Sequence, residues 1–169
     1  GVFVSLCTAK PHRSIEKIIK DAGLDNLHIS NGGGVIIDPI DNIVLKKHII
    51  NPELAQKVLS RSLEFGAYTE FYTINDYFVQ KNQVNQLTET HAFVLQHKPK
   101  IVDNLLEAAK KEEIVKLMPV AKNEDDKIKL FEWLKPTLGD LPIGWGIHPI
   151  ALPCQFAIIT ARGISKKQA

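Results

Sequence analysis

The sequence has little of what would mark a secreted or metal-binding protein. Only two of its 169 residues are cysteines, Cys7 and Cys154. Both have apolar neighbours in the sequence, which favours buried, reduced thiols over a disulfide and indicates a cytoplasmic protein. Two widely spaced cysteines give no support for a structural zinc site, and the six histidines show no metal-ligand spacing. The residues therefore predict no metal site formed by this chain.

Excess charge and long apolar runs are scarce too. The formal net charge is only +2, and no dense Lys/Arg run is present, which argues against a nucleic-acid partner. No apolar stretch has the length needed to cross a bilayer, and no signal peptide is expected. The remaining composition, 44% hydrophobic and 24% charged, is that of a globular protein that can bury a core in one domain or two small ones.

Residues 2–11 are the most informative stretch. Val2 to Cys7 form an apolar run of strand length, which predicts a strand buried on both faces of a parallel sheet. Thr8, Ala9 and Lys10 then fall at the carboxyl end of that strand, before a proline that suits the first turn of a helix. Ligands of open α/β sheets bind at this end of the strands, so we expect Thr8 to face a phosphate.

The next forty residues predict a βαβ unit followed by a hairpin. A helical apolar stripe ends at Gly23, and a short buried strand follows at 27–30, parallel to the first. Three glycines after Asn31 allow a sharp turn, but the absence of a Lys-Ser/Thr ending disfavours a P-loop. Strands at 35–37 and 43–45 then predict the hairpin.

The remainder predicts alternating helices and strands. Asn51-Pro52-Glu53 should begin a helix that ends at Gly66, and an aromatic hairpin should follow at 68–73 and 77–80. Residues 81–98 indicate a loop or a short helix. The later pattern predicts a helix at 101–109, a strand at 114–120, a helix from 123 with Ile128, Phe131 and Leu134 facing the core, and strands at 143–148 and 155–160.

Three motifs, in order, resemble those of the Cof-like phosphatases of the haloacid dehalogenase superfamily. Leu6-Cys7-Thr8-Ala9-Lys10-Pro11 matches the family's Thr-Gly-Arg-Pro pattern, with Ala9 and Lys10 in place of Gly and Arg. Asn31-Gly32-Gly33 matches its Asn-Gly-Ala turn, and Gly163-Ile164-Ser165-Lys166 its Gly-Val-Ser-Lys-Gly segment, with Lys167 in place of the last glycine. The resemblance covers essentially the whole chain, but the family's Asp-x-Asp and Gly-Asp-x-x-Asn-Asp motifs have no counterpart in it.

The resemblance implies a fold and a division into parts. It implies an α/β protein in which a partial Rossmann-like core, a βαβ remnant, carries an α/β cap with a mostly antiparallel sheet. The core remnant would span residues 1–45, the cap 46–152, and a truncated return to the core 153–169.

The resemblance also implies a chemistry. An Asp outside this chain would attack the phosphorus and form an aspartyl-phosphate, with Mg²⁺ bridging carboxylate and phosphoryl oxygen through ligands also outside the chain. Thr8, through its hydroxyl, and Ala9, through its N–H, would hold phosphate oxygens. Lys166 would neutralise charge at the reacting centre. Lys10, Asn31 and Gly32 are candidates for substrate contact.

Each of these residues has an ordinary structural interpretation as well. Thr8 is also a good helix-capping residue, Lys10 and Lys166 are also typical solvated lysines at helix starts, and Asn31-Gly32 is a common turn dipeptide. The order of the three motifs is what favours the functional interpretation.

The leading hypothesis is therefore a cap-bearing fragment of a Mg²⁺-dependent phosphatase of small phosphorylated metabolites, inactive without its nucleophile. The alternative is a noncatalytic module that binds a nucleotide or a partner protein through the βαβ unit and glycine turn. The strands at 2–7 and 27–30 are also expected to expose an apolar edge, which predicts self-association.

Overall fold

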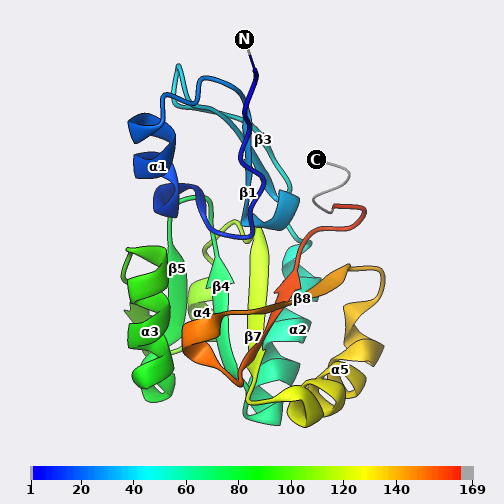
Figure 1. Cartoon of the computed structure of the whole chain (residues 1–169). Helices are drawn as coiled ribbons and strands as arrows, with labels where there is room; N and C mark the ends of the chain where they lie inside the picture. The colour runs from blue at the N-terminus through cyan, green and yellow to red at the C-terminus, as the bar shows by residue number, and fades with distance from the viewer. Residues whose placement is uncertain (1, 165–169) are drawn as a thin grey trace.

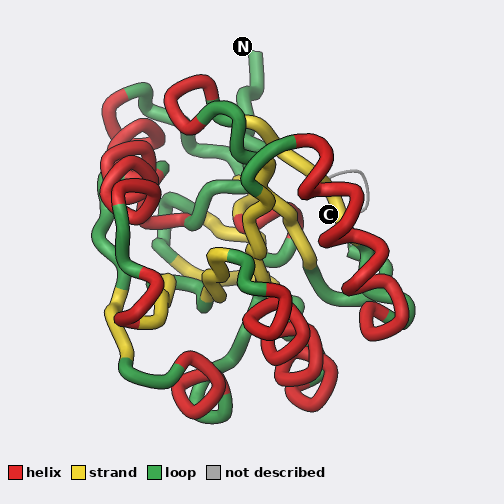
Figure 2. Tube along the Cα trace, turned by 90° about the horizontal axis from the view of Figure 1, so that it is seen from below, coloured by secondary structure: helices red, strands yellow, loops and turns green. Residues whose placement is uncertain are grey.

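The structure, a computed structural model, describes residues 2–164 and has an α/β fold with two sheets. The smaller sheet has the strand order β1-β2-β3, and the larger has the order β6-β5-β4-β7-β9-β8. In Figure 1 the smaller sheet and α1 form the upper part and the larger sheet with the other helices forms the lower part. Seen from below, the strands lie in the middle with helices around them (Figure 2). The predicted fold class is confirmed.

The elements have the following bounds. The strands are β1 (His28–Ser30), β2 (Val35–Asp38), β3 (Ile43–Lys47), β4 (Tyr68–Tyr72), β5 (Tyr77–Gln80), β6 (Lys100–Val102), β7 (Lys116–Ala121), β8 (Ile143–Ile147) and β9 (Gln155–Ile159). The α-helices are α1 (Glu16–Asp21), α2 (Pro52–Phe65), α3 (Gln86–Leu95), α4 (Leu105–Ala109) and α5 (Glu124–Leu138). Four 3-10 turns complete the described part: η1 (His12–Ser14), η2 (Asn31–Gly33), η3 (Lys81–Gln83) and η4 (Pro149–Ala151).

The N-terminal segment differs from its prediction. Cys7 makes a single parallel bridge to Ile29, but the segment before it is not part of either sheet. Val2 and Phe3 are 91% and 87% exposed, so the prediction of a strand buried on both faces is wrong. Within the described residues only one edge of this segment has a strand beside it, and side chains without a covering layer stay in solvent. The parallel bridge nevertheless has the direction expected of a βαβ unit.

Both cysteines are more exposed than predicted. Cys7 is exposed because it belongs to this uncovered segment, and Cys154 is half-buried directly before β9. The prediction of two buried thiols is therefore wrong.

Helix α2 forms as its sequence predicts. The Asn51 side chain accepts a hydrogen bond from the Leu54 N–H at 3.1 Å, and Pro52 occupies the first turn. The helix ends at Gly66, whose φ of 82° is the left-handed conformation that glycine adopts without steric cost. Val58 and Leu59, both fully buried, attach the helix to the larger sheet.

The two faces of the larger sheet have different neighbours. One face packs Phe71, Leu117 and Ile159 against residues of α2, α4 and α5. The other face packs Tyr72, Met118 and Phe156 with Leu95 of α3 and with two residues of β2, Val35 and Ile37. The second face is therefore where the N-terminal unit meets the larger sheet.

Two predicted details are corrected by the structure. Ile101 and Val102 lie in β6, parallel to β5, and the helix begins only after the Asn104 cap. In α5, Leu134 is buried and Phe131 packs against the core as predicted, whereas Ile128 is exposed and Leu130 is buried in its place. Strand β9 pairs with both β7 and β8 and so belongs to the larger sheet. Residues 86–95 form a helix, the second of the two possibilities for that stretch.

Candidate functional site

The loop of residues 8–10, which we call the phosphate loop after its predicted role, is tied to the turn at Asn31-Gly32. The Asn31 N–H donates to the Lys10 carbonyl at 2.9 Å, and the Gly32 N–H donates to the Thr8 carbonyl at 3.0 Å. The Thr8 N–H in turn donates to the Ile29 carbonyl at 3.0 Å. The structure thus brings five of the six predicted site residues together; Lys166 lies outside the described residues.

The Thr8 hydroxyl stabilises the loop itself. It accepts a hydrogen bond from the Lys10 N–H at 3.1 Å, which is the capping interaction expected of threonine at a strand-to-helix turn. A hydroxyl that accepts one hydrogen bond can still donate its own hydrogen. Thr8 can therefore shape the loop and donate to an oxyanion at the same time.

The glycine turn packs directly against the larger sheet. Asn31 and Gly32 have φ values of 52° and 73°, and both are buried. A Cβ added to Gly32 would lie 3.0 Å from Cγ2 of Ile158 in β9, so no side chain fits there without movement. Glycine at 32 is thus required by both conformation and close packing.

The Asn31 side chain is fully buried, and its amide oxygen and nitrogen have no hydrogen-bond partner among the described residues. Such a group is costly unless something else satisfies it. Asn31 and Gly32 are nevertheless not among the described residues that line the cavity next to the loop. Substrate contact by these two residues stays a prediction.

A cavity of about 230 Å³ lies between the phosphate loop and the larger sheet. Thr8, Ala9 and Lys10 form one wall. The other walls come from α3, the larger sheet and the end of β8, through His91, Val94, Leu95, Lys116, Met118, Phe156, Ile158 and residues 146–148. The cavity is therefore bounded by two parts of the chain that are far apart in sequence.

Lys116 on β7 is the residue of this cavity that the sequence did not indicate. It is only 2% exposed, and its Nζ donates to the Ala9 carbonyl at 2.8 Å and lies 3.4 Å from the centre of the Tyr72 ring. Burial lowers the pKa of Lys116 to about 7, although the negative charge of Glu70 opposes this. A titratable ammonium group thus touches the backbone of the phosphate loop.

Glu70 on β4 lies at the centre of a second buried polar group. It is 0% exposed and accepts hydrogen bonds from the Tyr68 hydroxyl at 2.7 Å and the Tyr72 hydroxyl at 2.6 Å. His91 Nδ1 of α3 lies 3.0 Å from the same carboxylate. Burial raises the pKa of Glu70, but the attraction of His91 and the three hydrogen-bonding side chains outweigh it and leave the pKa lowered. The carboxylate therefore stays ionised and holds His91 at the cavity wall.

These partners follow from the strand register. Tyr72 stands opposite Lys116, and Glu70 stands opposite Met118, in the antiparallel pair of β4 and β7. Because side chains alternate along a strand, all four lie on the face that meets the phosphate loop. Tyr68, Tyr72 and His91 are thus hydrogen-bond partners of one buried carboxylate.

Comparison with known proteins identifies the family of this chain. The family model described as haloacid dehalogenase-like hydrolase matches residues 1–169. The chain belongs to the haloacid dehalogenase-like hydrolase family. The superfamily resemblance carried by the three motifs is thus confirmed. Among curated proteins, none matches this chain.

Solved structures of this hydrolase family share the fold at low identity. The chain is similar to the subclass IIB sugar phosphatase BT4131 (20% identity, TM-score 0.76), with 99% of this chain and 60% of that one covered. The second is a haloacid dehalogenase-like hydrolase from B. subtilis, with 18% identity and a TM-score of 0.77; the match covers 99% of this chain and 64% of that one. The third is TM0651 from Thermotoga maritima, with 17% identity and a TM-score of 0.77; the match covers 97% of this chain and 58% of that one. The chain therefore spans about 60% of these relatives.

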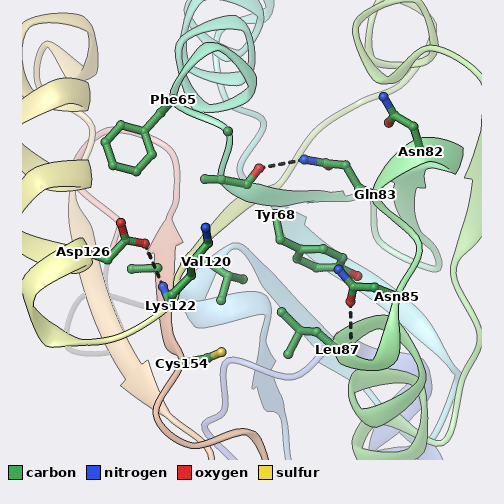
Figure 3. A pocket seen from close by; sticks show the side chains of 13 residues that line it. Phe65, Tyr68, Asn82, Gln83, Asn85, Leu87, Val120, Lys122, Asp126 and Cys154 are labelled. Carbon is green, nitrogen blue, oxygen red and sulfur yellow. Dashed lines mark hydrogen bonds between the residues drawn. The ribbon is translucent and has the colours of Figure 1, made fainter.

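A larger cavity of this hydrolase-family chain, about 540 Å³, lies at the other end of β4 and β7 (Figure 3). Three of its polar side chains already bond to the backbone. Gln83 donates to the Ala67 carbonyl at 2.7 Å, Asn85 accepts from the Leu87 N–H at 2.8 Å, and Asp126 accepts from the Lys122 N–H at 2.8 Å. These groups cap helices and close loops, so we assign the functional site to the smaller cavity.

The described residues do not supply a metal site. Within residues 2–164, no group of three or more His, Cys, Asp or Glu side chains is arranged to hold a metal ion. The carboxylate near the phosphate loop, Glu70, is already bonded to two tyrosines and a histidine. The residues present therefore do not fit Mg²⁺. Separately, no helix in the described part of the chain is both long and apolar enough to cross a membrane.

Proposed function

We propose that this chain is the cap-bearing part of a Cof-like, Mg²⁺-dependent cytoplasmic phosphatase that hydrolyses small phosphorylated metabolites through an aspartyl-phosphate. The nucleophilic Asp and the Mg²⁺ ligands belong to parts of the full-length protein outside these 169 residues. Residues 1–45 and the segment after β9 contribute to the core, and the larger sheet with α2 to α5 forms the cap. The family and the sugar phosphatase among the similar structures support this proposal.

The observation that carries the proposal is the meeting of the phosphate loop with the cap across one cavity. Thr8 and Ala9 offer a hydroxyl and an N–H to phosphate oxygens, and Lys10 adds positive charge beside them. Lys166, by the family motif, neutralises charge on the phosphoryl group. Preorganised donors of this kind stabilise the charge that develops in phosphoryl transfer.

Substitutions at Thr8 test the loop's role in the full-length protein, with phosphate release from p-nitrophenyl phosphate as the assay. Thr8→Ala removes one oxyanion donor and should lower kcat by about 10²-fold. Thr8→Ser keeps the hydroxyl and serves as the matched control, with activity within a few fold of the wild type. Lys166→Ala should abolish turnover, and the 169-residue chain without the rest of the protein should be inactive.

Unchanged turnover in both Thr8→Ala and Lys166→Ala would refute the proposal. The residues encoded upstream of Gly1 give a second check. An Asp-x-Asp stretch within one strand-helix unit is required for the phosphatase, and its absence would favour the noncatalytic binding module.

A further inference from the structure

The cavity beside the phosphate loop has a polar end and an apolar remainder. Thr8, Lys10 and Lys116 mark the polar end. The side chains that form most of the remaining wall are Val94, Leu95, Ile147, Met118, Phe156 and Ile158, all of them apolar. A ligand that fills this space therefore meets two ammonium groups and the Thr8 hydroxyl, two histidines, and otherwise mostly apolar side chains.

The polar side chains in the wall are already engaged. Lys10 Nζ donates to the Val94 carbonyl at 3.2 Å, and Lys116 Nζ donates to the Ala9 carbonyl at 2.8 Å. His91 is held by Glu70 at 3.0 Å, and His148 Nδ1 accepts from the Ile150 N–H at 3.4 Å. An ammonium group has three hydrogens, so each lysine can still donate to an anion, whereas each histidine has only one ring nitrogen left for a ligand.

Carboxylate and carboxamide acceptors for ligand hydroxyl groups are what the described part of the wall lacks. Among the described residues that line the cavity there is no Asp, Glu, Asn or Gln side chain. A sugar ring would bring several hydroxyl hydrogens into this space, and each one without an acceptor loses binding free energy. The volume of about 230 Å³ also lies below that of pockets for drug-sized ligands.

We propose that this cavity binds phosphate monoesters of small apolar alcohols, of about the size of a six-membered carbon ring, in preference to sugar phosphates. This inference rests on the proposed phosphatase function and specifies its substrate class. The phosphate group lies against Thr8, Lys10 and Lys116, and the apolar leaving group lies against Met118, Phe156 and Ile158.

The overall reaction is hydrolysis of the ester by one water molecule. The P–O bond to the alcohol breaks and a P–O bond to the water oxygen forms. One proton of the water ends on the alcohol oxygen and the other stays on inorganic phosphate. The two product molecules account for every atom, and no electron transfer is involved.

The test compares two esters that differ in their hydroxyl groups but not in ring size or ester type. Cyclohexylmethyl phosphate and glucose 6-phosphate are both phosphates of a primary alcohol on a six-membered ring. With the full-length protein, we expect kcat/KM for the cyclohexylmethyl ester to be at least about tenfold higher, which corresponds to one or two unpaired hydroxyls. Phosphate release is the assay, and p-nitrophenyl phosphate is the general substrate.

A substitution in the wall provides a second readout. Ile147 lines the cavity and is 60% exposed, so Ile147→Gln adds an acceptor and a donor without opening the core. It should reduce the preference for the apolar ester several-fold. Ile101→Gln, at a 55% exposed strand position that does not line this cavity, is the matched control and should leave the preference unchanged.

The outcomes separate this inference from the function on which it rests. Equal rates for the two esters, or faster hydrolysis of glucose 6-phosphate, would overturn the substrate class and leave the phosphatase standing. Hydrolysis of p-nitrophenyl phosphate with neither test ester turned over would also overturn the substrate class. Failure to hydrolyse all three esters would refute the phosphatase itself.

Discussion

Replacing Lys116 with methionine should make the stability of the chain less dependent on pH. The ammonium group is 2% exposed on β7, and burial lowers its pKa from 10.5 to about 7. Between these two pH values the unfolded chain binds more protons than the folded chain at this site. The free energy of unfolding contributed by Lys116 therefore rises as the pH increases from about 7 towards 10.5.

The size of the effect follows from the two pKa values. Each pKa unit corresponds to about 1.4 kcal/mol, so the whole penalty of burying the charged lysine is about 5 kcal/mol. About 2 kcal/mol of this disappears between pH 7 and pH 9. Lys116→Met keeps an unbranched side chain that is one atom shorter and has no proton to lose. The difference in unfolding free energy between the variant and the wild type should therefore move by about 2 kcal/mol between these two pH values, in favour of the wild type at pH 9.

Urea denaturation followed by tryptophan fluorescence, at pH 7 and pH 9, measures this difference. Other groups that titrate in the range cancel, because they are present in both proteins. Lys129→Met, at an exposed position on α5, is the matched control and should shift stability equally at both pH values. A difference for Lys116→Met that stays constant with pH, or moves in the opposite direction, would refute the idea of a buried ammonium against the phosphate loop.

Three further changes test other parts of the structure. Glu70→Gln removes the charge that accepts three hydrogen bonds and should lower the unfolding free energy by about 3 kcal/mol at pH 7. This loss should shrink as the pH falls below about 4.5, where the carboxylate becomes protonated in the unfolded chain. Glu89→Gln, at an exposed position, should cost little, and an equal loss in both variants would contradict the buried network. Gly32→Ala should cost about 2 to 4 kcal/mol in urea denaturation, from left-handed strain and a 3.0 Å contact, whereas Gly23→Ala meets nothing within 4 Å and should cost only about 1. Phe3→Ser should reduce self-association of the chain in light scattering, since Phe3 is 87% exposed; an unchanged particle size, or a monomeric wild type, would argue against association through this segment.

Elements with local signals were predictable from the sequence. Asn51, Pro52 and Gly66 mark both ends of α2 by capping chemistry that needs no tertiary information. The phosphate loop and the Asn31-Gly32 turn could be paired because βαβ units place the carboxyl ends of parallel strands side by side. The bridge from Cys7 to Ile29 has the direction that this rule requires.

Features that depend on distant partners could not be predicted. Lys116 lies in an ordinary-looking strand sequence, and its burial follows only from the loop that covers β7. Glu70 lies between Thr69 and Phe71 in the sequence, and its histidine partner lies 21 residues further on, in α3. An apolar run such as residues 2–7 indicates a preference for burial, but burial requires a covering layer, which no local pattern reports.

Two lysines cross between the phosphate loop and the larger sheet with its helix, in opposite directions. Lys10 of the loop donates to Val94 of α3, and Lys116 of β7 donates to Ala9 of the loop. Any motion that separates the two parts must break both hydrogen bonds and rehydrate both ammonium groups. An anion in the cavity would use the ammonium hydrogens that these two bonds leave free. The two side chains that join the loop to the larger sheet and its helix are thus the same two that would hold a phosphate.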